Sequence, residues 1–210
     1  MRGKRIETFD GQAHCYIDSN LQTFDIDAAL GEVSEQRRNQ ALKYSHEPGR
    51  RQCLAAYMLL KEALFEDFGI EGNPVFDYYD GGKPFLRDFP HIHFSISHCR
   101  NAVACVLHDA PVGIDIETIR PYKPRLAAYV LNGRELQDVE ASSRRDIAFI
   151  RLWTMKESML KMTGQGIRSD LKQLNLQNGC FFTAVEEEDG AVVTVCRAKE
   201  NILLNSNFTI

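Results

Sequence analysis

The chain has 210 residues, of which 44% are hydrophobic, and its formal net charge at pH 7 is −4. This composition excludes a disordered chain and supports a buried core belonging to one domain or to two small ones. The acidic balance argues against a general nucleic-acid binder. No apolar run has the length of a signal peptide or a membrane span, so we expect a cytoplasmic protein without membrane contact. Six cysteines without a CxxC pair are typical of reduced thiols.

The first half of the chain reads as helices followed by strands. Apolar spacing predicts a short charged helix over 34–44 and a longer one over 49–68, which stops at Gly69. A loop is expected at 80–84. Period-two patterns predict strands over 75–79, 91–97, 102–107 and 112–117.

The second half repeats this layout. Helices are expected over 123–131, 133–141 and 143–163, and strands near 174–176, 181–185, 191–196 and 202–208. A long helix that ends at a glycine and is followed by strands thus occurs twice, at Gly69 and at Gly164. We predict an α+β fold, a pseudo-twofold pair of similar halves, each with a long helix packed on a small, mainly antiparallel sheet. The expected division is between residues 1–108 and 109–210.

Carboxylates and a lysine suggest a magnesium and phosphate site in the second half. In Gly113 to Glu117, alternation on a strand puts Asp115 and Glu117 on one face. Glu157 and Lys161 lie four residues apart on the last predicted helix. Three hard oxygen ligands suit Mg²⁺, whose remaining positions are commonly filled by water and substrate phosphates. The alternative is an ordinary surface pair of Glu157 with Lys161.

The helix around Glu157 carries a polar stripe on a mostly apolar surface. Because buried charged groups need partners, we expect this stripe to line a cleft. Residues 111–175 contain eleven Lys or Arg against eight Asp or Glu, an excess that could steer an acidic substrate there. The stripe consists of Arg151, Thr154, Glu157, Ser158 and Lys161.

Motifs in the first half leave several alternatives open. Lys83, between Gly82 and Pro84, could contact a phosphate or lie in an ordinary turn. His98 ends a buried strand face, where it could meet a ligand or core carbonyls. A zinc site is a further alternative, formed by His91, His93, His98 and Cys99. An anion-binding patch or a solvated helix face could be formed by Arg37, Arg38, Arg50 and Arg51.

Four motifs taken together resemble one enzyme family. In chain order they are GGKPFL, FSISH, VGIDIE and WTMKESMLK, between residues 34 and 166. This set resembles the 4′-phosphopantetheinyl transferases, specifically the surfactin-synthetase-activating type. The resemblance implies Mg²⁺-dependent transfer of the phosphopantetheine arm of coenzyme A to a serine of an apo acyl or peptidyl carrier protein, with release of adenosine 3′,5′-bisphosphate.

The resemblance also implies roles for individual residues. Lys161 would contact the phosphates, and Arg51 would lie near the adenosine. Glu135 matches a further acidic position of the family, as a possible catalytic residue. The proposed Mg²⁺ ligands are Asp115, Glu117 and Glu157. The coenzyme A pocket would be lined by Lys83, Pro84, Ser97 and His98. The first half would then supply most coenzyme A contacts and the second half the Mg²⁺ ligands.

One part of the sequence departs from the family pattern. Gln36 and Asn39 occupy positions where family members carry basic residues, which puts nucleotide contacts from the first short helix in doubt. Glu157 is the candidate general base, followed by Glu135. Two other functions stay open: a Mg²⁺-dependent phosphohydrolase acting on a coenzyme A-like or nucleotide substrate, and a non-catalytic coenzyme A-binding module.

Overall fold

A computed structural model describes residues 3–8, 13–166, 170–186 and 190–199. Over these ranges no helix combines the length and apolar character needed to cross a membrane. The N-terminal half contains β1 (Lys4–Thr8), β2 (Ala13–Asp18), α1 (Ile26–Glu32), α2 (Glu35–Leu42), α3 (Glu47–Phe68), β3 (Phe76–Tyr78), β4 (Pro84–Leu86), β5 (His93–His98) and β6 (Val103–His108). The C-terminal half contains β7 (Val112–Thr118), α4 (Pro124–Val130), α5 (Gly133–Ala141), α6 (Arg145–Thr163), β8 (Gly179–Glu186) and β9 (Ala191–Ala198).

The two main sheets repeat one topology, which confirms the predicted pair of α+β halves. Their strand orders are β1-β2-β6-β5 and β7-β9-β8, with every hydrogen-bonded neighbour antiparallel. In each half a strand is followed by two short helices, a long helix and a hairpin whose second strand pairs with the first strand. Both long helices end at a glycine in the left-handed conformation, Gly69 and Gly164. The division between residues 108 and 109 falls at the end of β6, where the connection to β7 begins, and stays a prediction.

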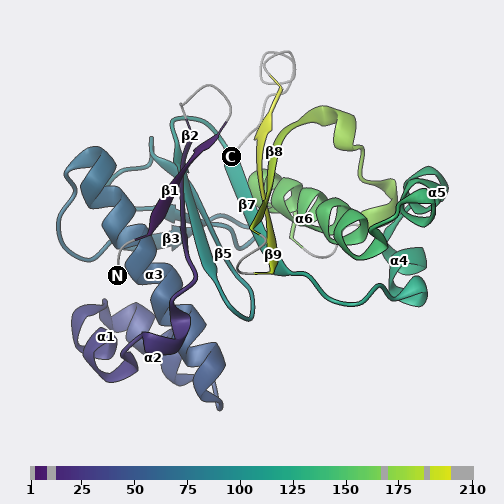
Figure 1. Cartoon of the computed structure of the whole chain (residues 1–210). Helices are drawn as coiled ribbons and strands as arrows, with labels where there is room; N and C mark the ends of the chain where they lie inside the picture. Colours follow the sequence, from purple (N-terminus) through teal and green to yellow (C-terminus); the bar gives the residue numbers. More distant parts are fainter. Residues whose placement is uncertain (1–2, 9–12, 167–169, 187–189, 200–210) are drawn as a thin grey trace.

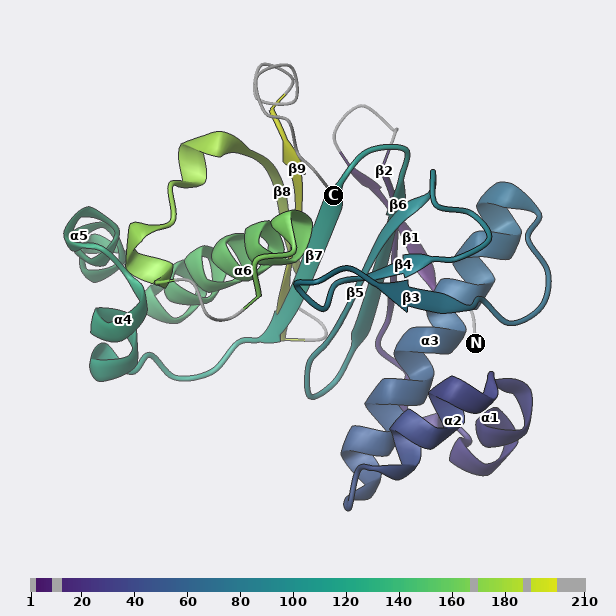
Figure 2. The ribbon, with the colours of Figure 1, turned by 180° about the vertical axis from the view of Figure 1, so that it is seen from behind.

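The layers follow from the alternation of side chains along the strands. Helix α3 covers one face of the first sheet, the two sheets pack against each other, and α6 covers the far face of the second sheet (Figures 1 and 2). On β6, Cys105 and Leu107 join the cluster around α3, whereas Ala104 and Val106 join the cluster between the sheets. Because successive side chains of a strand point to opposite faces of the sheet, each central strand buries apolar residues on both faces.

Serine hydroxyls connect the edges of the two sheets. Ser95 Oγ on β5 accepts a hydrogen bond from Ile114 N on β7 (3.1 Å), and Ser97 Oγ accepts one from Ile116 N (3.3 Å). Both contacts advance by two residues on each strand, so β5 and β7 run parallel at this junction. Because buried N–H groups of β7 need acceptors, the hydroxyls take the place of a backbone ladder. This role of Ser95 was not predicted.

Several element predictions were wrong. Strands β1, β2 and β4 and helix α1 were not predicted. The segment predicted as a strand near 174–176 is instead the connection between two 3₁₀ turns, Leu171–Gln173 and Leu176–Asn178, and enters the second of them at Leu176. The strand predicted over 202–208 lies outside the described residues.

Gly113 lets α6 approach β7 closely. A Cβ atom at this position would lie 2.5 Å from Met162 N and closer still to Ser158 O, and both of these are backbone atoms. We expect Gly113→Ala to lower the free energy of unfolding by about 1–3 kcal/mol or more, because the helix must move away from the sheet. Urea unfolding tests this, with Gly133→Ala as the control, since nothing lies within 4 Å of a Cβ there. Equal effects of the two substitutions would contradict the close packing.

Candidate active site

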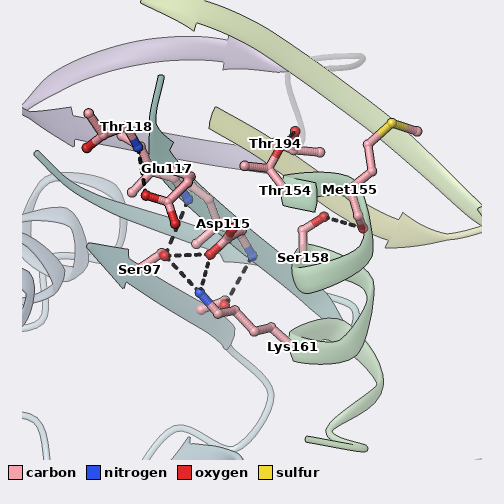
Figure 3. Close-up of polar contacts among 12 residues, drawn as sticks. Ser97, Asp115, Glu117, Thr118, Thr154, Met155, Ser158, Lys161 and Thr194 are labelled. Carbon is pink, nitrogen blue, oxygen red and sulfur yellow. Dashed lines mark hydrogen bonds and ion pairs between the residues drawn. The ribbon is translucent and has the colours of Figure 1, made fainter. Parts of the chain in front are cut away.

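A lysine from α6 meets a carboxylate and a hydroxyl where β5 and β7 lie side by side (Figure 3). Lys161 Nζ lies 2.8 Å from Asp115 Oδ1 and 2.8 Å from Ser97 Oγ. Ser97 Oγ donates to the same Asp115 oxygen at 2.9 Å. The alternation of β7 sends Ile114 and Ile116 into the core between the sheets and leaves Asp115 to face α6. The structure therefore brings Asp115 and Lys161 of the second half into contact with Ser97 of the first half.

Glu117 carries a different set of contacts. Its Oε1 accepts a hydrogen bond from Thr118 N at 2.9 Å, and its Oε2 lies 3.0 Å from an Arg120 guanidinium nitrogen. Its side chain is partly buried. Each carboxylate of β7 thus has a cationic neighbour, Lys161 beside Asp115 and Arg120 beside Glu117.

Glu157 lies in the electric field of both carboxylates on β7. Burial raises its pKa, the negative charge of Asp115 raises it further, Lys161 opposes this, and Glu117 raises it again. Like charges that destabilise one another in this way form a site where added positive charge is favourable.

Whether the side chains of this site suit a metal ion depends on which metal is considered. Among the described residues, no three His, Cys, Asp or Glu side chains stand close enough to bind one ion. The zinc alternative formed by His91, His93, His98 and Cys99 therefore finds no support in the described residues. Magnesium needs fewer protein ligands, since it commonly binds one or two carboxylates and fills its other positions with water and substrate oxygens. The hard oxygen donors of Asp115, Glu117 and Glu157 fit magnesium chemically.

The polar stripe of α6 divides into two parts. Glu157 and Lys161 line a cavity, as predicted. Thr154 is fully buried and its hydroxyl lies 2.7 Å from that of Thr194 on β9, while the Ser158 hydroxyl donates to Met155 O (Figure 3). The hydroxyls of the stripe therefore join packing contacts, Glu157 and Lys161 face the site, and Arg151 is exposed and lines neither cavity described below.

Two adjoining cavities meet at Lys161 and Ile96. The first, of about 310 Å³, is lined by the loop Gly81–Pro84 together with Glu157, Gly164 and Gly166. The second, of about 340 Å³, lies between β5 and the helices α2 and α3. Its polar lining consists of Arg37, Gln40, Tyr44, Ser97, His98, Asp115 and Lys161. An elongated ligand could thus pass across Lys161 with its two ends in different cavities.

His98 lines the second cavity, and its contact with a ligand stays a prediction. Desolvation by surrounding atoms lowers its pKa, and the charge of Lys161 lowers it further. Neutral imidazole is therefore favoured near neutral pH in the ligand-free protein.

Lys83 connects the two halves of the chain. Its Nζ donates to Met162 O at the end of α6 (2.8 Å) and to Val112 O at the start of β7 (3.2 Å), and burial lowers its pKa to about 8. A Cβ on Gly81 would collide with the carbonyl of Gly164, so the loop lies directly on the helix end (Figure 2). Pro84 begins β4 beside it and lines the first cavity.

The burial of Lys83 has a testable consequence for pH. Between pH 8 and its unfolded pKa of 10.5, the folded chain binds fewer protons at this residue than the unfolded chain, so stability rises with pH. We expect the free energy of unfolding of the wild type, relative to Lys83→Met, to increase between these two pH values in urea titrations. A constant difference would mean that the ammonium group is solvated.

The helix pair α2 and α3 carries arginines close to the positions of Gln36 and Asn39, where the family pattern has basic residues. Gln36 and Asn39 are exposed, and Arg37 is buried with its guanidinium over the rings of Tyr57 and Phe76. Arg51 pairs with Glu47 on the first turns of α3. Arg37 lines the second cavity, a position that the sequence left undecided.

Comparison with known proteins gives these residues a family. Residues 111–196, which contain Asp115, Glu117, Glu157 and Lys161, match the 4′-phosphopantetheinyl transferase superfamily. A 4′-phosphopantetheinyl transferase of Bacillus pumilus is 33% identical over 161 residues, 75% of this chain and 66% of that protein. The transferase Sfp of Bacillus subtilis strain 168 is 25% identical over 201 residues, 87% of this chain and 90% of that protein. The chain belongs to the 4′-phosphopantetheinyl transferases, of the Sfp type.

In this transferase, Glu135 takes part in a buried ion pair away from the Lys161 cluster. Glu135 Oε1 lies 2.9 Å from Nζ of Lys156, which is fully buried and also donates to Leu171 O at 2.7 Å. Glu135 Oε2 accepts from Asn132 N and completes the capping box of α5. Both oxygens are therefore occupied by structural contacts. Lys156 was missed by the sequence analysis.

Proposed function

We propose that this transferase moves the 4′-phosphopantetheine arm of coenzyme A to a serine of an apo acyl or peptidyl carrier protein, and releases adenosine 3′,5′-bisphosphate. The observation that supports this most is the position of Lys161. Its ammonium group lies where two cavities meet, beside the carboxylates of Asp115 and Glu157. If the pyrophosphate of coenzyme A lay beside Lys161, its negative charge would face the ammonium group. The two ends of the ligand could then extend into the two cavities.

The proposed reaction needs little covalent catalysis from the protein. The serine oxygen forms a bond to the phosphorus that carries the pantetheine arm, and the bond from that phosphorus to the bridging oxygen breaks. Lys161 stabilises the negative charge that develops on the phosphate oxygens. Glu157 accepts the serine proton, a role that its raised pKa favours.

Magnesium, when bound, would supply further positive charge beside the pyrophosphate, and Asp115, Glu117 and Glu157 would hold it. On the nucleotide side, His98, Ser97 and Arg37 line the second cavity, and Arg51 lies on the adjacent helix. Coenzyme A contacts are thus assigned mainly to residues 1–108 and the acidic ligands to residues 109–210.

The test is a transfer assay read by intact mass. The protein is incubated with coenzyme A, Mg²⁺ and a panel of purified apo carrier proteins, and we expect one phosphopantetheine to be added to the carrier serine. A carrier whose serine is replaced by alanine serves as the control. Loss of coenzyme A without carrier protein, and without any carrier modification, would overturn transfer and indicate hydrolysis.

Ligand binding can be tested separately from transfer. We expect coenzyme A to stabilise the fold by about 2.7 kcal/mol at a hundredfold excess over Kd. Dephospho-coenzyme A should stabilise less, because His98 and the arginines of α2 and α3 would lack the 3′-phosphate. Equal thermal shifts for the two ligands would remove these residues from that role.

A further inference from the structure

The second cavity contains a thiol that the proposed reaction does not use. Cys53 on α3 lines this cavity of about 340 Å³, and 4% of its surface is exposed. Its sulfur accepts a hydrogen bond at 3.6 Å from Nη1 of Arg37, which lines the same cavity. Among the described residues, no other cysteine lines either of the two cavities that meet at Lys161. The Cys53 sulfur therefore lies beside the space that a ligand would enter.

The other five thiols have different surroundings. Cys15 and Cys99 pack between the two sheets. Cys105 packs in the cluster around α3, and Cys196 packs against α6. Burial raises the pKa of Cys15 and of Cys196 to about 12, and it also raises the pKa of Cys105, so thiolates are disfavoured at these three positions. Cys180 on β8 is partly exposed and lines neither cavity, so it can serve as a reference thiol.

Arg37 indicates that an anion belongs in the second cavity. It lies on α2, beside α3 (Figure 1), and 7% of its surface is exposed. Its guanidinium lies over the rings of Tyr57 and Phe76. In the described part of the chain it has no salt bridge to a carboxylate and no hydrogen-bond partner for its Nε. Because a buried charge is costly without a counter-charge, an anionic group that enters the cavity would stabilise this guanidinium.

The other charges of the second cavity do not supply this anion. Asp115 contributes a carboxylate to the lining, but its Oδ1 lies 2.8 Å from Lys161 Nζ, so these two charges balance each other. His98 also lines the cavity, and desolvation lowers its pKa, which favours the neutral imidazole. The unbalanced charge of the cavity is therefore the guanidinium of Arg37, next to the Cys53 sulfur. A small anion that carries a disulfide would be drawn toward this thiol.

We propose that Cys53 is a site of reversible thiol–disulfide exchange with anionic disulfides of small thiols, and that the mixed disulfide closes the second cavity to coenzyme A. The Cys53 sulfur attacks one sulfur of the small disulfide, the S–S bond of that molecule breaks, and a new S–S bond joins Cys53 to one of its halves. The proton of Cys53 passes to solvent, and the other half takes up a proton and leaves as a thiol. Arg37 holds the anionic group of the reagent and gives the attacking thiolate a counter-charge.

The regulatory consequence rests on the proposed function, because it requires the nucleotide of coenzyme A in the second cavity. An adduct on Cys53 and this nucleotide would compete for the same volume and for the guanidinium of Arg37. A bound nucleotide should therefore protect Cys53, and an adduct should block coenzyme A. The transferase would then stop where small thiols, coenzyme A among them, are oxidised to disulfides.

The first test follows each thiol by peptide mass during incubation with glutathione disulfide or coenzyme A disulfide, which carry carboxylates and phosphates respectively. An adduct on Cys53 with either reagent supports the site, and the faster reagent identifies the anionic group that it prefers. Adenosine 3′,5′-bisphosphate, which has no thiol, should slow the Cys53 adduct about a hundredfold at a hundredfold excess over its Kd and leave Cys180 unaffected. Arg37→Met should slow glutathione disulfide more than the uncharged hydroxyethyl disulfide.

The second test measures what the adduct does to the enzyme. After removal of the reagent, modified wild type should bind adenosine 3′,5′-bisphosphate about tenfold more weakly or worse and should lose transfer activity in proportion to the fraction modified. Dithiothreitol should restore both. Cys53→Ala and Cys53→Ser, each compared with its own untreated rate, should be insensitive to the treatment. Cys180→Ser is the matched control and should lose activity as the wild type does.

The outcomes separate this inference from the proposed function. An unmodified Cys53 under conditions that modify Cys180 overturns the exchange site. A Cys53 adduct that forms equally fast with bound nucleotide, or that leaves nucleotide binding unchanged, overturns the block of coenzyme A. If the untreated wild type modifies no carrier protein while the nucleotide still protects Cys53, the proposed transfer is wrong and the exchange site stands.

Discussion

Replacing Glu135 by glutamine should lower the free energy of unfolding by about 3–5 kcal/mol. The reason is the Lys156 ammonium group, which is fully buried and has Glu135 as its counter-charge at 2.9 Å. After the substitution, this charge would retain Leu171 O as an acceptor but would lose its compensating carboxylate. The Glu135–Lys156 pair and the contact of Lys156 with Leu171 O also hold α5 and the 3₁₀ turn at Leu171–Gln173 against α6. In the variant we therefore expect α5 and this turn to detach from α6 before the rest of the protein unfolds. Urea unfolding and hydrogen exchange measure these effects.

A double substitution distinguishes this structural role from catalysis. Glu135→Leu/Lys156→Met removes both charges and keeps apolar volume, so stability should return toward the wild-type value. Transfer activity should return with it if Glu135 acts only through the fold. A Glu135→Gln variant with wild-type stability and a greatly reduced kcat would instead make Glu135 a catalytic residue.

The parts of the fold that follow from local patterns were predicted well. Helix α3 shows an apolar period and a glycine stop, and its end at Phe68 agrees with the expected end of the helix. Strand β7 alternates cleanly, so the common face of Asp115 and Glu117 could be read from the sequence. The repeated layout also predicted the two halves, because each half needs one long helix to cover one small sheet.

Interactions between distant segments were not predictable in the same way. Lys156 lies on an otherwise apolar helix face, and its partner Glu135 precedes it by 21 residues on another helix. Lys83 resembles a free cation in a glycine loop, yet it binds backbone carbonyls of the other half. Hydrophobic periodicity reports the burial of a position, but it does not identify the group that satisfies a buried charge.

In the candidate site, too, local patterns predicted some features, whereas contacts between distant segments were not predicted. Alternation and helical spacing predicted Asp115, Glu157 and Lys161, and the structure brings these residues together. The direct contact of Lys161 with Ser97 depends on β5 lying beside β7, which no local pattern predicts. Arg37 was seen only as one member of a possible anion patch, because its cavity forms where α2 and α3 meet β5.

Replacing Glu157 by glutamine should lower kcat for transfer by about 10²–10⁴-fold, the loss typical of a missing general base. Glutamine keeps the size of the side chain and one carbonyl oxygen, so coenzyme A binding should persist. Folding should also persist, because burial and the charge of Asp115 both disfavour the ionised form of Glu157 in the folded protein. Single-turnover transfer to an apo carrier, together with a binding titration of coenzyme A, measures the two effects separately.

The aspartate variant and the metal dependence separate a base from a ligand. Glu157→Asp restores a carboxylate with a shorter reach, so it should recover part of the rate that glutamine loses. Suppose instead that Glu157→Gln regains the wild-type kcat when Mg²⁺ is raised to saturation. Glu157 would then serve only to bind metal, and the base would have to be another group that reaches the serine. Glu135 would be the next candidate for the general base only if Glu135→Gln keeps wild-type stability. In the structure its two carboxylate oxygens already contact Asn132 N and Lys156 Nζ.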